Sequence, residues 1–284
     1  MKRLIARVVS VTIFVVSIVE LVLSVGVALS SATARGEIIG FGGNGAGWTL
    51  NGSAVASDDV LTLTDNNPAE ASSLFYNTQV PVTTAFTTTF TYTAGGIKGG
   101  NGAAFVLEND PRGTNAIGGD GSGLGYGTAL FSSNGPGTPI TPSLALEFNI
   151  YTEFPGYTPG TQYATNGTTG GYSPTTPVNL ASGDPILVSL NYDGSQYLIE
   201  TLTDLTTSST WSTTYTVGSL SATTGGTSAY VGFTAGTGSA VSTQTIENFT
   251  FSSNVVPEPS TLTLLGSALL GLGVVYMRRR KARG

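Results

Sequence analysis

The sequence of 284 residues contains no histidine and no cysteine, and these absences exclude several classes of function. Without them there can be no Ser-His-Asp or Cys-His nucleophile, no zinc site of Cys and His, and no disulfide framework. Any bound metal must be held by oxygen ligands, which favours a hard cation such as calcium. Charged residues are also scarce, at 10% against about 25% in an ordinary globular domain. This composition, with 39 glycines, is typical of an extracellular β-rich protein.

The N-terminus has the pattern of a secretory signal peptide. Three basic residues within positions 2–7 precede an apolar run from Val8 to Val19, and Ala32-Thr33-Ala34 supplies the small residues of a signal peptidase site. We therefore expect residues 1–34 to be removed on export. The alternative is a permanent N-terminal membrane anchor.

The C-terminus carries a second hydrophobic segment beside a basic cluster. Pro257-Glu258-Pro259 precedes an apolar run at 261–277, and Arg278–Lys281 follows at once. This run is just long enough to cross a bilayer, with the basic cluster on the cytoplasmic side. The arrangement resembles the PEP-CTERM sorting tail of bacterial envelope proteins. The resemblance implies a sorting signal at 255–284, a temporary transmembrane helix and processing by an exosortase-type enzyme; a simple C-terminal anchor is the alternative.

The segment between the two ends, residues 35–254, is strongly acidic. It holds three basic and fifteen acidic residues, which gives a net charge of −12. Such a surface repels nucleic acid and anionic lipid, so we expect a neutral ligand and no nucleic-acid partner. Its length of 220 residues suits a single β-sandwich domain.

This segment shows repeated strand patterns and no convincing helical pattern. Residues 81–93 alternate with the period of two that is typical of a strand, and 186–192 and 197–202 flank an Asp193-Gly194 hairpin turn. Further strands are expected at 60–64, 103–107, 143–151, 228–234 and 245–251. The longest loop, 154–177, is expected to be functional or disordered. We therefore predict an all-β fold, a single antiparallel β-sandwich.

Six groups of residues resemble, in the same order, the L-type (legume-type) lectin domain. They are Trp48–Ala54 with Leu61–Thr64, Phe75–Thr78 with Phe86–Tyr92, Gly99–Leu107, Gly118–Tyr126, Ser143–Tyr151 and Tyr230–Gly238. The resemblance extends over residues 41–253. It implies a concanavalin-like jelly roll that binds a neutral glycan or exopolysaccharide.

The strand at 143–151 is the candidate metal-binding strand. Its apolar residues alternate with Glu147, Asn149 and Tyr151, which therefore share the opposite face. Such a face suits a cation or a sugar; an ordinary solvent-facing surface is the alternative. The resemblance puts Glu147, Asn149, Tyr151 and Glu153 at metal-ligand positions. However, Asn149 replaces an Asp that bridges two metals, and the family's His ligand is absent, so the resemblance implies a degraded site that could at most hold calcium.

The resemblance also implies a set of sugar-contacting residues. They are Asn101, Gly119, Gly121, Glu153, Ala235 and Gly236. Asn101 replaces an Asp that accepts hydrogen bonds from two sugar hydroxyls. An amide can still accept and donate, although without the strength that a charge adds. From the residues alone, Asn101-Gly102 favours a simple turn.

We expect an exported carbohydrate-binding protein of the cell envelope or the extracellular space. One alternative is a structural envelope or matrix protein that keeps the lectin fold without binding sugar. Another is a jelly-roll glycoside hydrolase. The hydrolase is disfavoured because six strand residues separate Glu147 from Glu153 by about 20 Å, whereas paired catalytic carboxyl groups lie about 5–9.5 Å apart. We therefore predict that the protein is not an enzyme.

Overall fold

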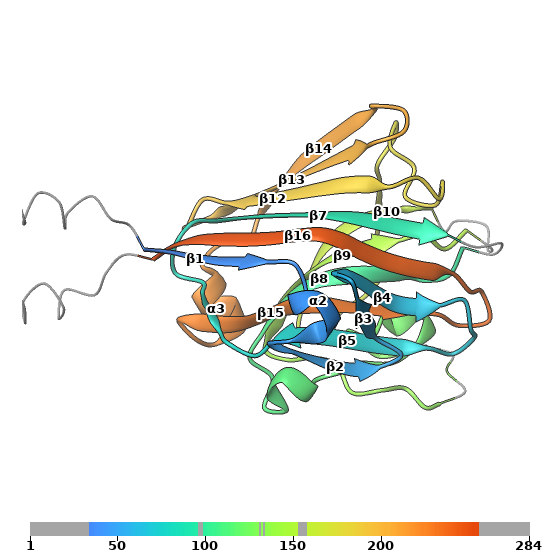
Figure 1. Cartoon of the computed structure of the whole chain (residues 1–284), viewed down its shortest axis with the longest axis horizontal. Helices are drawn as coiled ribbons and strands as arrows, with labels where there is room; N and C mark the ends of the chain where they lie inside the picture. The colour runs from blue at the N-terminus through green and yellow to red at the C-terminus, as the bar shows by residue number, and fades with distance from the viewer. Residues whose placement is uncertain (1–33, 96–98, 131, 133, 153–157, 256–284) are drawn as a thin grey trace, which may run out of the picture. The chain divides into compact units, whose positions relative to one another are not determined.

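The computed structural model describes residues 34–95, 99–130, 132, 134–152 and 158–255. It confirms the predicted all-β class, because two eight-stranded antiparallel sheets pack against each other (Figure 1). Within the described ranges no helix is long and apolar enough to span a membrane. The predicted C-terminal membrane segment lies in residues 256–284, outside those ranges. The predicted signal peptide also lies outside them except for its last residue, Ala34, which begins β1.

The first sheet has the order β14-β13-β12-β7-β16-β4-β3, and β1 pairs with β16. Its strands are β1 (Ala34–Ile39), β3 (Val55–Ser57), β4 (Val60–Asp65), β7 (Phe86–Gly95), β12 (Ile186–Tyr192), β13 (Tyr197–Asp204), β14 (Thr210–Thr216) and β16 (Thr243–Val255). The hairpin predicted at Asp193-Gly194 joins β12 to β13, and the predicted strand at 81–93 begins later, at Phe86.

The second sheet has the order β11-β10-β9-β8-β15-β5-β2, and β6 pairs with β15. Its strands are β2 (Trp48–Gly52), β5 (Ala71–Tyr76), β6 (Val80–Pro81), β8 (Gly102–Glu108), β9 (Ser143–Asn149), β10 (Gly160–Thr165), β11 (Ser173–Pro174) and β15 (Ser228–Gly236). The short helices are α2 (Gly42–Gly45), α3 (Leu220–Thr224) and the 3-10 turns η1 (Gly113–Asn115) and η2 (Gly121–Gly123).

Part of the predicted long loop at 154–177 is ordered strand. Residues 160–165 form β10, which pairs with β9 along its whole length, and β11 pairs with the start of β10. The expectation of a structureless loop is wrong there, because pairing with a buried neighbouring strand satisfies the backbone of a segment with few apolar residues. Residues 153–157 lie outside the described ranges.

The main core fills the space between the sheets with aromatic rings. Phe90 of the first sheet makes an edge-to-face contact with Phe233 of the second, with ring centroids 4.9 Å apart. The rings of Phe105 and Phe148 also lie against Phe90. Period-two alternation puts these side chains on the inner faces, and their burial supplies the main stabilising free energy of the sandwich.

The outer face of the second sheet is also buried. The long segment between β8 and β9 covers it, so that Phe75, Ala104 and Ala145 of the sheet pack with Tyr126 and Ile140 of this segment. We call residues 109–142 the covering loop. Every residue of β8 and of β9 is consequently buried. The alternative of a solvent-facing surface on β9 is therefore wrong, since its outer face lies under this loop.

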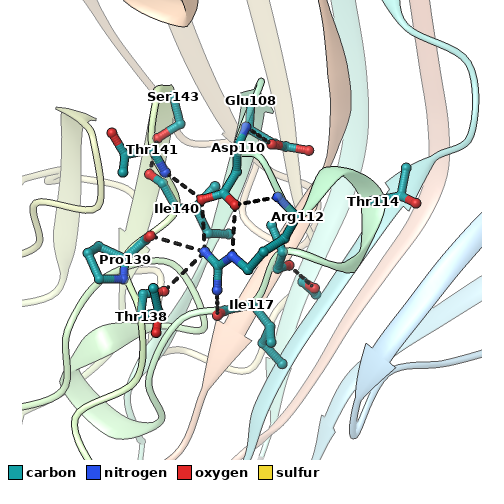
Figure 2. Close-up of polar contacts among 12 residues, drawn as sticks. Glu108, Asp110, Arg112, Thr114, Ile117, Thr138, Pro139, Ile140, Thr141 and Ser143 are labelled. Atoms are coloured by element: carbon teal, nitrogen blue, oxygen red, sulfur yellow. Dashed lines mark hydrogen bonds and ion pairs between the residues drawn. The ribbon is translucent and has the colours of Figure 1, made fainter.

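Arg112 links the two ends of the covering loop to each other, as Figure 2 shows. Its guanidinium donates two hydrogen bonds to the Asp110 carboxylate, from Nε at 2.7 Å and from Nη2 at 2.9 Å. It also donates to the carbonyl oxygens of Ile117, at 2.8 Å, and Pro139, at 3.0 Å. Asp110 in turn accepts a hydrogen bond from the Thr141 N–H. One planar fork of donors thus joins the start of the loop to its end.

Candidate functional site

A pocket of about 720 Å³ lies at one end of the second sheet. Here β8 begins, while β9 and β15 end, because Gly102 pairs with both Asn149 and Gly236. The covering loop and the segment before β11 complete the walls. The lining residues are Asn101, Gly121, Ser122, Leu124, Leu130, Asn149, Tyr151, Thr169, Gly170, Tyr172, Gly238, Ser239 and Ala240.

Asn101 continues the strand ladder at the floor of this pocket. Its N–H donates to the Gly236 carbonyl at 2.9 Å, and its carbonyl accepts from the Ile150 N–H at 3.0 Å. The alternative of a simple turn at Asn101-Gly102 is therefore wrong. Gly102 is required here, because its φ is +149° and a Cβ would lie 2.2 Å from the Phe148 carbonyl oxygen. This close backbone approach sets the position of Asn101.

The side-chain oxygen of Asn101 is buried and accepts no hydrogen bond from the part of the chain that the structure describes. It lies close to two glycines of the pocket wall, since a Cβ on Gly121 would be 3.8 Å from it and one on Gly238 3.2 Å. A buried acceptor without a donor costs about 1–3 kcal/mol. A ligand that donated a hydrogen bond to this oxygen would remove the cost.

Asn149 makes hydrogen bonds to the backbone on both sides of the segment 153–157. Its amide nitrogen donates to the Thr158 carbonyl at 3.1 Å and contacts the Tyr151 carbonyl at 3.5 Å. Its amide oxygen accepts from the Tyr151 N–H at 3.3 Å. Only one orientation of the amide puts the NH₂ group opposite both carbonyls, so the donors and acceptors are clearly assigned.

Glu147 lies on the same face of β9 as Asn149 and is completely buried. This burial raises the pKa of Glu147 to about 8, and the nearby Tyr172 side chain and Gly170 backbone only partly oppose the effect. The carboxyl group is therefore mostly protonated at neutral pH.

The structure brings together four of the residues that the resemblance selected. Asn101, Gly121, Asn149 and Tyr151 line the same pocket. The others are arranged differently: Glu147, Gly119, Ala235 and Gly236 are buried behind the pocket wall, and Glu153 falls outside the described residues. For example, a Cβ on Gly119 would lie 2.5 Å from the Pro136 carbonyl oxygen, so this glycine is needed for packing inside the loop.

The sequence interpretation missed two parts of the wall. Gly238, Ser239 and Ala240 line the pocket just after β15, and the glycine-rich run that continues past Gly236 was a usable signal for them. Residues 169–172 lie within the loop predicted at 154–177, but nothing in the sequence singles them out. They come directly before β11, which pairs with β10.

The described residues do not fit the two-metal site that the resemblance implies, and Glu153 lies outside them. Among the described residues, no three Asp or Glu side chains come together in a way that could hold a metal ion. In addition, the Asn149 amide presents hydrogen atoms to the carbonyls of Tyr151 and Thr158. A cation at those carbonyls would face a donor instead of a ligand.

Two family models match this chain. The legume lectin domain matches residues 37–265, and the PEP-CTERM protein-sorting motif matches residues 255–281. Both agree with the resemblances found in the sequence. The second motif marks an exported protein with a C-terminal sorting signal.

Solved structures of lectins share the fold. A lectin from Bauhinia forficata in complex with GalNAc has 21% identity and a TM-score of 0.63, covering 78% of this chain and 99% of its own. Arcelin-5, a lectin-like defence protein from Phaseolus vulgaris, has 19% identity and a TM-score of 0.62, with coverage of 79% and 100%. A metal-free form of lectin I-B4 from Griffonia simplicifolia has 22% identity and a TM-score of 0.59, with coverage of 74% and 94%. With the lectin model matching most of its length, this chain belongs to the legume lectin domain family.

Proposed function

We propose that the protein is an exported lectin that binds a neutral glycan in the pocket around Asn101. The observation that carries this proposal is the buried Asn101 oxygen without a donor at the pocket floor. A sugar hydroxyl is a donor of the right kind, and it would supply the hydrogen bond that the described part of the chain does not.

The chemistry of the pocket wall supports a sugar over a charged ligand. Every lining residue that the structure describes is uncharged. Leu130 is 72% exposed and offers apolar surface for the C–H face of a sugar ring, while Ser122 and Ser239 offer hydroxyl groups for its edge. A mainly apolar wall with a few polar groups is typical of small-ligand sites. These groups bind and orient a ligand, so we propose a binding role and no enzymatic one.

The two ends of the chain support a role outside the cytoplasm. We propose that residues 1–34 act as a signal peptide and that 255–284, with the helix at 261–277, anchor the precursor until an exosortase-type enzyme processes it. The lectin domain, residues 35–254, would then act in the cell envelope or the extracellular space. Its net charge of −12 disfavours nucleic acid, and an exopolysaccharide is the ligand class we propose.

A glycan array probed with the purified full chain tests this proposal. The array should hold neutral mono- and oligosaccharides and bacterial exopolysaccharide fragments. We expect binding that Asn101→Ala weakens about tenfold, the effect of one hydrogen bond worth about 1.4 kcal/mol. Asn191→Ala is the matched control, because Asn191 is an exposed residue of β12 in the other sheet.

Each outcome of the array has a definite meaning. Equal weakening by Asn101→Ala and Asn191→Ala would place the glycan elsewhere on the protein. Absence of binding across chemically diverse glycans, from a chain that unfolds cooperatively, would favour the structural envelope protein instead. Release of reducing sugar from any of the glycans would instead support the alternative of a glycoside hydrolase.

A further inference from the structure

We propose that the side chain of Asn149 replaces a metal ion in this protein, so that the glycan pocket keeps its shape without any bound cation. The part of this inference that concerns glycan binding rests on the proposed function. The part that concerns the folded structure does not, because it can be measured on the protein alone.

Backbone pairing on both sides fixes the position of Asn149. Asn149 ends β9 and lies between two neighbouring strands, paired with Gly102 of β8 and with Gly160 of β10. Its side chain is only 3% exposed. The direction and depth of the amide are therefore set by the sheet.

The amide joins two points of the chain that a cation could otherwise join. The carbonyl oxygens of Tyr151 and Thr158, seven residues apart in sequence, both face the Asn149 nitrogen, at 3.5 and 3.1 Å. Backbone carbonyls are common calcium ligands, because a cation can bind several of them at once. An amide NH₂ group has two hydrogen atoms and can likewise donate to two carbonyls. The neutral side chain thus makes the same cross-link by hydrogen bonding.

The cross-link also determines where Tyr151 lies. Its N–H donates to the Asn149 oxygen, at 3.3 Å, while its carbonyl faces the Asn149 nitrogen. Both polar groups of the Tyr151 backbone are therefore fixed by one side chain. Since Tyr151 lines the glycan pocket beside Asn101, Asn149 acts as a positioning residue for the pocket.

Thermal unfolding of the full chain tests the inference without any sugar. We expect the same Tm in excess EDTA, in excess calcium and in excess manganese, because no cation contributes to the fold. A Tm that rises with either metal and falls with EDTA would overturn the proposal, since it would show an intact metal site.

The variant Asn149→Asp tests the role of the amide itself. A carboxylate cannot donate, so it would face the two carbonyls with a negative charge. In EDTA we expect the Tm to fall by about 4–8 °C, as when two hydrogen bonds are lost from a domain of this size, and calcium should restore much of it. An unchanged Tm in EDTA would overturn the proposal. Should the aspartate variant fail to fold without calcium, Asn149→Ser, which removes the cross-link without adding charge, provides the same comparison.

Asn109→Asp is a matched control. The amide nitrogen of Asn109 also donates to two backbone carbonyls, of Thr224 at 3.1 Å and of Ser228 at 2.7 Å, but beyond the other end of β8. We expect it to lose stability without changing the affinity for the glycan identified on the array. For the wild type, that affinity should be the same in EDTA and in calcium; a loss of tenfold or more in EDTA would overturn the inference. If no glycan binds at all, the proposed function fails, and the Tm measurements still decide the role of Asn149.

Discussion

Gly238 and Asn101 meet at the floor of the pocket, where a Cβ on Gly238 would lie 3.2 Å from the buried side-chain oxygen of Asn101. A methyl group at that distance would press against the acceptor that we assign to a sugar hydroxyl. The absence of a side chain at Gly238 therefore keeps this acceptor available.

Replacing Gly238 by alanine should weaken glycan binding about tenfold while leaving the fold intact. The new methyl group would displace the Asn101 amide from its position, which costs about the one hydrogen bond that the amide makes to the ligand. Titration calorimetry with a glycan from the array measures the effect. Gly95→Ala at the end of β7 is the control, since the nearest atom to its Cβ would be 4.0 Å away. Equal affinity of the two variants would contradict this view of Gly238.

Replacing Leu130 by glutamine should weaken glycan binding a few-fold with almost no loss of stability. Leu130 is 72% exposed at the pocket, so its apolar surface is available to a ligand and contributes little to the core. Surface substitutions of this kind change stability by about 0.5 kcal/mol or less. Leu205→Gln is the matched control, as an exposed leucine that does not line the pocket. If both variants bind the glycan as the wild type does, Leu130 takes no part.

Replacing Arg112 by methionine should destabilise the protein by about 2–3 kcal/mol. The substitution leaves the Asp110 carboxylate and the carbonyls of Ile117 and Pro139 without their shared donor. This loss of stability is smaller than the usual cost of breaking a buried ion pair, because the Arg112 side chain is 31% exposed and solvent partly screens its charge. Calorimetry should show a fall in Tm of about 4–12 °C.

The lysine variant of Arg112 separates charge from geometry. Lysine keeps the positive charge but lacks the planar fork, so we expect it to recover only part of the lost stability. Hydrogen exchange should become faster in the covering loop in both variants. Unchanged exchange there would show that other contacts hold the loop.

The stability of the protein should fall as the pH rises from about 4.5 to 7. Glu200 of β13 is completely buried, and its carboxyl accepts a hydrogen bond from the Tyr215 hydroxyl at 2.8 Å. Burial raises the pKa of Glu200 to about 7, although hydrogen bonds from Tyr215 and Thr161 partly oppose this. Across this range the unfolded chain loses the proton while the folded protein keeps it. Glu200 should therefore contribute about 3 kcal/mol to the decrease in the free energy of unfolding.

Glu200→Gln should flatten this pH dependence, because glutamine stays neutral in both states. Chemical unfolding at a series of pH values measures it, and the stability of the variant relative to the wild type should increase toward pH 8. Burial also raises the pKa of Glu108 and of Glu147 to about 8, so a decline in the same direction should remain in the variant, smaller than in the wild type by the contribution of Glu200. Identical pH profiles of the two proteins would contradict the raised pKa of Glu200.

The strands with clear alternation could be predicted from the sequence because their inner and outer faces differ in polarity. β12 matches the predicted 186–192, and β13 extends the predicted 197–202 by two residues. For β8 and β9 the sequence indicated strands but could not show that both faces are buried, because the cover comes from a distant loop. β14 escaped prediction for a related reason, since its inward side chains are Trp211, Thr213 and Tyr215 among threonines and serines.

The candidate site, too, could be predicted only in part from the sequence. The resemblance selected Asn101, Gly121, Asn149 and Tyr151, which lie within recognisable motifs and do line the pocket. The hydrogen-bond partner of Asn149 at Thr158 could not be predicted. This contact depends on how β10 pairs with β9, and no local pattern in the sequence encodes that register.

The attachment of the covering loop by Arg112 divides that loop into two parts with different tolerance to change. One guanidinium joins the two ends of the loop to each other, whereas Ser122 and Leu130 in its middle part reach the pocket. Under the proposed function, substitutions at the exposed Leu130 would alter which glycan is accepted at little cost to folding. An engineer seeking new specificities should vary Leu130 and leave Asp110, Arg112 and the buried Tyr126 untouched.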